Sequence, residues 1–241
     1  MDFKEAFDSF NQKNILIVGD VMLDAYVNGA VSRISPEAPV PIVNLTNKEN
    51  RLGGAANVAL NIASLGATPI ICAVVGSDYD GEILNDLLVE AQLDTSGILV
   101  DVDRRTTKKT RVIADHQQML RIDQEDTHDL KESMAENFVN NIKRIVTTRH
   151  IDAIIFEDYN KGLLSEKVIT ELIAFANEND VITTVDPKSN NFFAYKNVTL
   201  FKPNLKELNE GVKQDCDPKI KNSSLRELKY LKKKLIQHIH L

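Results

Sequence analysis

Short apolar runs alternate with helical stretches along most of this 241-residue chain. Residues 69–75 form a continuous apolar run, which is typical of a strand buried in a parallel sheet. Residues 55–65 carry apolar side chains at helical spacing and stop at Gly66, a residue typical of a helix C-terminus. The same alternation predicts strands at 14–18, 97–102, 152–156, 181–185 and 198–201, and helices at 79–91, 130–146 and 165–177. This βαβ rhythm predicts an α/β fold, a mainly parallel sheet with helices on both faces.

Two segments break this rhythm. Residues 25–45 contain three prolines among β-forming residues, and residues 106–123 alternate apolar and polar side chains around a turn near Asp115 and His116. Both patterns predict antiparallel strands with one solvated face. We expect these two segments to form a small antiparallel β lid, inserted into a single domain that spans residues 1–241.

The composition, 43% hydrophobic and 27% charged, is that of a folded globular protein. No apolar run approaches the roughly 20 residues of a membrane span, and the polar N-terminus is unlike a signal peptide. Two cysteines, Cys72 in an apolar run and Cys216 in a polar one, cannot form a disulfide framework. These features predict a cytoplasmic protein with no membrane partner.

The net charge of −6 is unevenly distributed. Residues 219–241 carry +6, so the first 218 residues carry −12, which argues against a nucleic-acid partner. The basic tail has apolar residues at helical spacing: Leu225, Leu228, Leu231, Leu235 and Ile239. This spacing fits either a helix on a membrane surface or a helix that covers the domain, and the covering helix is the simpler interpretation.

The usual glycine-rich signatures of dinucleotide-binding and P-loop proteins are absent, so the candidate site rests on other motifs. Asp20 follows the first predicted strand, and Asp24 lies four residues on. In open α/β sheets ligands bind beyond the carboxyl ends of the strands. Ionised carboxylates only accept hydrogen bonds, so this pair suits a ligand rich in hydroxyls, such as a sugar. The alternative is that both are turn or cap residues.

Gly53 and Gly54 directly precede a predicted helix, and Asn57 lies in its first turn. Paired glycines let a ligand approach the backbone and the free N–H groups at a helix start. Asn57 offers both a donor and an acceptor. The alternative is a simple chain break between two elements.

Five of the eight residues from Arg104 to Arg111 are basic, and Arg121 follows. On the lid of an acidic body, such a cluster is typical of a grip on an anion such as phosphate. The alternative is a charged edge strand that discourages aggregation. We expect Arg104 and Arg105 to be exposed, and Arg111 and Arg121 to be the functional members.

Three polar clusters each follow a predicted strand, at 157–162, 186–188 and 202–207. Because these strands are expected to be parallel, the clusters converge on one rim of the sheet. Asn204 and Glu207 are three residues apart, on one helix face, where they are suited to a hydrated Mg²⁺ near phosphates. Any one cluster is also consistent with a helix cap.

Eight stretches appear in order between about Asn14 and Gly211: GDVMLD, SRISPEAPVPIV, GGAANVALNIASLGA, TKKTRV, HQQMLRID, EDYNKG, VDPK and KPNLKEL. Together they resemble the ribokinase-type (PfkB) sugar kinases. The SRISPEAPVP stretch narrows the resemblance to the members that act on D-glycero-β-D-manno-heptose 7-phosphate, in ADP-heptose and lipopolysaccharide synthesis. The resemblance implies a ribokinase-like, Rossmann-type three-layer sandwich with ATP and Mg²⁺ as cofactors. It also implies a homodimer that pairs through the lid.

The resemblance also implies residue roles. The residues expected to hold sugar hydroxyls are Asp20, Asp24, Gly53, Gly54 and Asn57. Those expected to meet the sugar phosphate from the lid are Lys109, Arg111 and Arg121. Those expected to line the floor between sugar and ATP are Asp158, Lys161, Asp186 and Lys188. The ATP phosphates would be bound by Asn204, Lys206 and Glu207, with Glu207 holding Mg²⁺ indirectly.

One departure from the family pattern concerns catalysis. These kinases carry a later Gly-Ala-Gly-Asp motif that supplies an anion hole and the base, and this sequence does not contain it. Phosphoryl transfer depends on positioning and charge stabilisation, so we expect a domain cut short at its C-terminus, without a catalytic residue of its own. Two alternatives remain: another PfkB-family sugar kinase, or a non-catalytic module for sugar-phosphate binding or dimerisation.

Overall fold

The computed structural model describes residues 2–213. Within them, the larger sheet has six strands in the order β10-β9-β8-β1-β4-β5. These strands are β1 (Asn14–Gly19), β4 (Thr68–Gly76), β5 (Asp94–Asp101), β8 (Ala153–Glu157), β9 (Ile182–Asp186) and β10 (Leu200–Phe201). Every pairing described in this sheet is parallel, so the predicted parallel sheet is confirmed.

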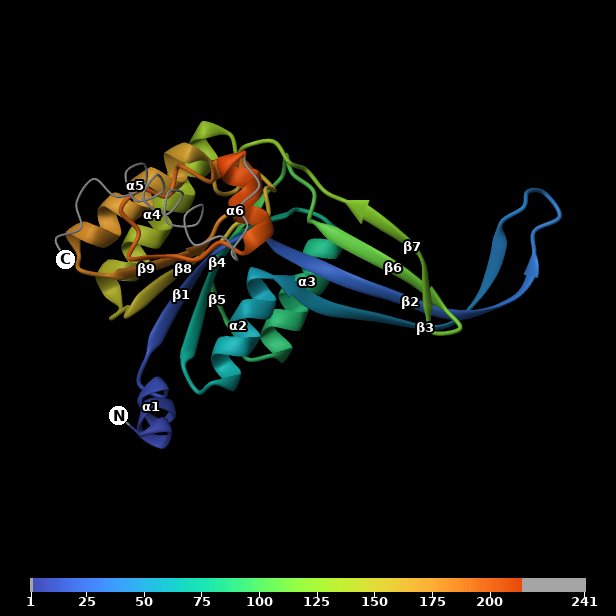
Figure 1. Cartoon of the computed structure of the whole chain (residues 1–241), viewed down its shortest axis with the longest axis horizontal. Helices are drawn as coiled ribbons and strands as arrows, with labels where there is room; N and C mark the ends of the chain where they lie inside the picture. The colour runs from blue at the N-terminus through green and yellow to red at the C-terminus, as the bar shows by residue number, and fades with distance from the viewer. Residues whose placement is uncertain (1, 214–241) are drawn as a thin grey trace, which may run out of the picture.

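Helices cover both faces of this sheet (Figure 1). On one face, α2 (Ala55–Ser64) and α3 (Tyr79–Glu90) pack over Ile17 of β1. On the other, α4 (Glu132–Thr148) and α5 (Glu166–Glu178) pack over Leu16 and Val18. The predicted three-layer α/β sandwich is therefore confirmed. The remaining helices are α1 (Phe3–Phe10), α6 (Leu205–Val212) and a 3₁₀ turn (Ser189–Asn191).

Two strands of this sheet start two or more residues from the predicted position. β5 begins at Asp94 rather than at residue 97. Its first residues are polar, and the apolar pattern did not predict them as strand because β5 is an edge strand that pairs on one side only. Gly97 lies inside the strand, where a Cβ would stand 2.3 Å from the carbonyl oxygen of Ile71 on β4. β10 is only two residues long. Cys72 is fully buried in β4, as predicted.

The described residues also form a four-stranded lid in the order β3-β2-β6-β7. Its strands are β2 (Val21–Ile34), β3 (Pro41–Gly54), β6 (Lys108–Ala114) and β7 (Gln117–Gln124). Each predicted segment lies in a hairpin, and Asp115 and His116 form the second turn with positive φ angles. The first hairpin is longer than the predicted 25–45, because β2 starts at Val21 and β3 continues to Gly54. Figure 1 shows the β2–β3 hairpin extending beyond β6 and β7.

The prediction of a wholly antiparallel lid is wrong at one joint. β2 pairs with β6 in parallel, so the lid is a mixed sheet. Both strands start at the core and run outward, because the chain returns through α2, β4, α3 and β5 between the two hairpins. Two strands that leave the core side by side in the same direction pair in parallel.

Several sequence predictions fall outside the described residues. The basic segment 219–241 with its spaced leucines, and Cys216, lie there. Among the helices of residues 2–213, none combines the length and the apolar character needed to cross a membrane.

The helix layer over Leu16 and Val18 generates a stability prediction. Ile142 of α4 is fully buried, whereas Ile182 of β9 is 54% exposed. We expect Ile142→Ala to lower the free energy of unfolding by about 2–5 kcal/mol, because it removes buried methyl groups and leaves a cavity. Ile182→Ala is the matched control and should cost under about 1 kcal/mol. Urea denaturation measures both, and equal losses would contradict this packing.

Candidate functional site

The carboxyl ends of the central strands meet at one rim. β1 pairs with β8, and β8 with β9, so that Gly19, Glu157 and Asp186 lie side by side. A Cβ on Gly19 would stand 2.2 Å from the carbonyl oxygen of Glu157, so only glycine permits this approach. Asp20 and Asp158 follow directly. The predicted convergence of polar clusters on this rim is present in the structure.

Asp20 is buried and holds the loop that follows β8. Its Oδ2 accepts hydrogen bonds from the backbone N–H groups of Tyr159 (2.9 Å) and Lys161 (3.1 Å). Burial raises the pKa of this carboxyl to about 6, although the two hydrogen bonds oppose the shift. Asp20 is thus both a loop-holding residue, as the turn interpretation expects, and a carboxyl at the rim.

Asp158 lies beneath the rim. It is 2% exposed and accepts hydrogen bonds from the Tyr195 hydroxyl (2.9 Å) and the Asn160 N–H (2.8 Å). Asn191 also donates to it, at 3.4 Å. These contacts fix the loop from within the protein, so Asp158 supports the rim from below.

The lid presents a charged face. In the strand register Asp24 is level with Lys109, and Lys109 with Asp123, while Arg111 is level with Arg121. Residues level with each other, or two apart along a strand, share a face. The structure therefore brings together the lid residues that the sequence singles out: Asp24, Lys109, Arg111 and Arg121.

Ion pairs cross this face. Arg111 Nη1 lies 2.5 Å from Asp24 Oδ1, and its guanidinium stacks 5.4 Å from the ring centre of Tyr26. Arg121 Nε binds Asp123 at 2.9 Å. The cations expected to meet a phosphate are held by carboxylates of the protein.

Glu125 joins the lid to the rim. Its Oε2 lies 2.7 Å from Lys161 Nζ and 3.1 Å from Lys109 Nζ. Lys161 belongs to the loop held by Asp20, whereas Lys109 belongs to β6 of the lid. Two lysines on different elements thus share one carboxylate, a residue the sequence reasoning did not single out.

The paired glycines pack closely against the two aspartates, Asp20 and Asp24. A Cβ on Gly53 would stand 2.4 Å from Asp24 Oδ2, and one on Gly54, where φ is +61°, 2.3 Å from the Asp20 carbonyl oxygen. Asn57 is exposed and lines a cavity of about 410 Å³ with Arg51 and residues of α2 and α3. The glycines lie at the predicted site, whereas Asn57 faces this cavity.

A second charged group lies at the ends of β9 and β10. Asn204 caps α6: its Oδ1 accepts from the Glu207 N–H, and its own N–H donates to Glu207 Oε2, both at 2.9 Å. Lys188 Nζ donates to the other Glu207 oxygen. The helix-cap interpretation holds for this motif. Lys206 points to solvent, with a side chain 84% exposed.

Carboxyl groups crowd this part of the rim. Burial, then the hydrogen bond to Glu207, raises the pKa of Asp186. Burial opposes ionisation of Glu207, but hydrogen bonds from Lys188 and Asn204 outweigh it and lower its pKa. Burial and the charge of Asp186 raise the pKa of Glu157 to about 7. Glu157 begins the predicted cluster 157–162, but sequence reasoning gave it no role of its own.

One prediction about the basic cluster is wrong. Arg104 is half-buried rather than exposed, and it donates hydrogen bonds to the carbonyl oxygens of Lys161 and His128, both at 2.5 Å. Arg105 is exposed as predicted, with a side chain 60% accessible. Arg104 donates to loops that lie 24 and 57 residues away in the sequence. The residues next to Arg104 in the sequence therefore could not predict its burial.

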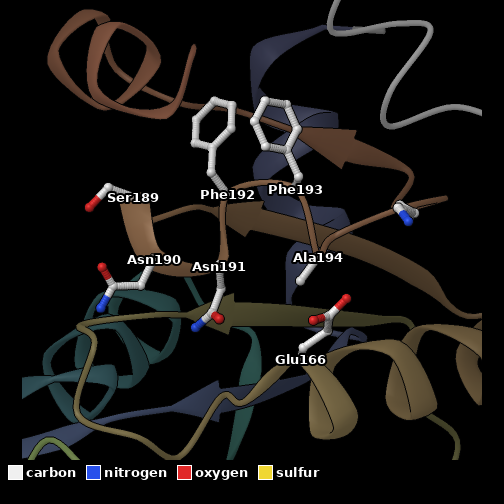
Figure 2. A pocket seen from close by; sticks show the side chains of 8 residues that line it. Glu166, Ser189, Asn190, Asn191, Phe192, Phe193 and Ala194 are labelled. Carbon is white, nitrogen blue, oxygen red and sulfur yellow. The ribbon is translucent and has the colours of Figure 1, made fainter. Parts of the chain in front are cut away.

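Another cavity, of about 320 Å³, lies beside the loop after β9. Figure 2 shows the rings of Phe192 and Phe193 on one side of this loop and the Asn191 side chain on the other. Asn191 Nδ2 is engaged by the Leu164 carbonyl oxygen at 2.7 Å. Because the Asn191 side chain points away from the Phe192 and Phe193 rings (Figure 2), these groups do not converge on one ligand position. The rim under the lid, where polar side chains lie together, is the stronger candidate site.

Comparisons with known proteins bear on the family and the fold of the chain. Residues 12–239 match the model of the pfkB family of carbohydrate kinases. The chain is 39% identical over 221 residues to the bifunctional protein HldE of Aliarcobacter butzleri, covering 92% of the chain and 46% of that protein. It is 41% identical over 193 residues to HldE of Helicobacter hepaticus, covering 80% and 40%. The chain thus spans less than half the length of these curated relatives.

The fold also matches solved structures. Phosphofructokinase-2 from Escherichia coli, in its tetrameric inhibited form, superposes with a TM-score of 0.70 at 18% identity, covering 93% of this chain and 71% of the other. A carbohydrate kinase from Agrobacterium tumefaciens gives a TM-score of 0.61 at 19% identity, covering 83% and 63%. The parallel sheet, the lid and the matched family model lead to one conclusion: this chain belongs to the pfkB family of carbohydrate kinases.

Proposed function

We propose that this chain binds a sugar phosphate under its lid, as part of an ATP-dependent kinase for D-glycero-β-D-manno-heptose 7-phosphate. The observation that carries the proposal is the charged lid face, where Lys109 and Arg111 lie beside Asp24. Carboxylates accept from sugar hydroxyls, and paired cations suit a phosphate. The similarity to HldE over most of this chain supports a heptose substrate. We place the reaction in the cytoplasm, where ATP is available.

In this proposal the rim and the lid divide the substrate between them. Asp20 and Asp24 accept from hydroxyls of the ring. Lys109, Arg111 and Arg121 face the phosphate, with Lys161 reaching it from the loop after β8. The phosphate must then replace carboxylates that now hold these cations, chiefly Asp24 and Glu125.

ATP and Mg²⁺ would bind at the other charged group. Within residues 2–213, no three histidine, cysteine, aspartate or glutamate side chains form a group that could hold a metal ion directly. Both Glu207 oxygens are engaged. The buried Asp186 Oδ1 has no hydrogen-bond partner, although Lys202 Nζ lies 3.8 Å from it. This donor set fits a hydrated ion held through water, with Mg²⁺ neutralising phosphate charge when bound.

We also propose that the lid pairs two copies of the chain. Leu120 and Ile122 alternate with Arg121 along β7, so they lie on the face opposite the charged one. They are 55% and 48% exposed, and Leu45 of β3 is 52% exposed. Exposed apolar residues gathered in this way mark an interaction surface.

Arg111 provides the test of the ligand. We expect Arg111→Ala to weaken binding of heptose 7-phosphate more than that of the unphosphorylated heptose, by about 1.5–3 kcal/mol, since a charge-assisted hydrogen bond is lost. Because the chain lacks a Gly-Ala-Gly-Asp sequence, calorimetric titration of binding is the measurement. Arg144→Ala, at an exposed arginine of α4, is the control. An equal loss for both sugars would contradict a phosphate role, and tighter binding of fructose 6-phosphate would favour another sugar kinase.

The lid face provides the test of assembly. We expect the wild-type chain to sediment as a discrete dimer, and the double variant Leu45→Asp with Leu120→Asp to sediment as a monomer, because buried unpaired carboxylates oppose association. Val89→Asp, at a 58% exposed valine of α3, is the control and should remain dimeric. A monomeric wild type, or a dimer indifferent to the lid changes, would rule out pairing through the lid.

A further inference from the structure

Arg104 ties together three connections that are distant in sequence. It lies between β5 and β6, and its guanidinium donates to Lys161 in the β8–α5 connection and to His128 in the β7–α4 connection. Its Nε is buried without a hydrogen-bond partner. The position of the guanidinium thus lets Nη1 and Nη2 donate to two carbonyl oxygens, while Nε stays buried without a partner, which is unfavourable.

The two connections that Arg104 bridges already touch each other. Gly162 has a φ of +82°, and a Cβ on it would stand 1.9 Å from the His128 carbonyl oxygen. The Leu130 N–H donates to the Gly162 carbonyl oxygen at 3.1 Å. The loop after β8 is therefore pressed against the segment that leaves the lid, and Arg104 closes this junction.

The same loop holds Asp20. The Lys161 carbonyl oxygen accepts from Arg104, while the Lys161 N–H donates to Asp20. Charged and titratable residues near the Asp20 carboxyl include Asp158, Arg104, Lys161, Tyr159 and Tyr195. Lys161 contacts Asp20 through its backbone N–H, whereas the positive charge of Arg104 lowers the Asp20 pKa directly, so Arg104 acts on Asp20 both through the loop and through its charge.

We propose that Arg104 is a positioning residue that keeps the loop of residues 158–162 closed over Asp20, so that this carboxyl stays buried and oriented at the sugar site. The contribution of Arg104 to ligand binding rests on the proposed function, in which Asp20 contacts the substrate. The closure itself does not depend on that function.

The two ways in which Arg104 acts have opposite effects on the Asp20 pKa. Burial is the largest cause of the raised value of about 6 and outweighs the two loop hydrogen bonds that lower the pKa. A loop that opens fully loses both effects and admits water, so the pKa falls towards its ordinary value of 3.8. Loss of the arginine charge alone, with the loop still closed, would raise the pKa further. The sign of the change therefore separates positioning from simple electrostatics.

The experiment is an NMR titration of the chain carrying ¹³C-labelled aspartate carboxyls, with Asp20 identified by the signal missing in Asp20→Asn. In Arg104→Met we expect the Asp20 midpoint to fall by at least about one unit. Arg104→Lys keeps the charge but cannot bridge two carbonyl groups, and we expect the same fall. Arg105→Met is the control and should leave the midpoint unchanged.

A higher or unchanged midpoint in Arg104→Met, or full retention in Arg104→Lys, would overturn the proposal. Amide exchange in the wild type gives a second measurement that needs no variant to fold. The Tyr159 and Lys161 amides should be protected, and exchange as fast as in an open chain would also overturn it. Finally, Arg104→Met should weaken sugar-phosphate binding at least about tenfold. Failure of the wild type to bind would count against the proposed function and leave the titration result standing.

Discussion

The alignment of β1 with β8 and β9 is the constraint on which the candidate site depends. Parallel pairing without a register shift brings Gly19, Glu157 and Asp186 to one level, and each strand ends there. The absence of a side chain at Gly19 allows the backbones to approach at that level. Strand length then places four polar groups of the rim: Glu157 and Asp186 are the last paired residues of their strands, and Asp20 and Asp158 come directly after paired residues.

The sequence predicted the framework well for a physical reason. Buried parallel strands are continuous apolar runs, and amphipathic helices repeat every 3.6 residues, so residues 69–75 and 55–65 are recognisable locally. The parallel pairing of β2 with β6 could not be found in this way, because it depends on where the chain goes between the two hairpins. The polar start of β5 was missed for a related reason, since an edge strand does not need an apolar sequence.

The site was predictable by residue type but not by contact. Asp20, Asp24, Lys109 and Arg111 were found from the chemistry of their side chains, and the register brings the last three together. Their partners were not found. Glu125 lies outside every motif, and Arg104 donates to carbonyl groups 24 and 57 residues away. Every residue has a backbone carbonyl group, so the sequence does not show which of them an arginine binds. From the sequence alone, an arginine that binds backbone carbonyl oxygens therefore looks the same as an exposed one.

The carboxylate shared by Lys109 and Lys161 has a consequence for selectivity. A site already neutralised by its own counter-ion discriminates by exchange, since an entering anion must replace the resident carboxylate rather than fill an empty positive field. A monoanion offers little advantage over Glu125, whereas a phosphate dianion brings more charge and more acceptor oxygens. If the site binds a sugar phosphate, as we propose, Glu125 would disfavour small monoanions and would keep the two lysines paired until a phosphate dianion replaces it.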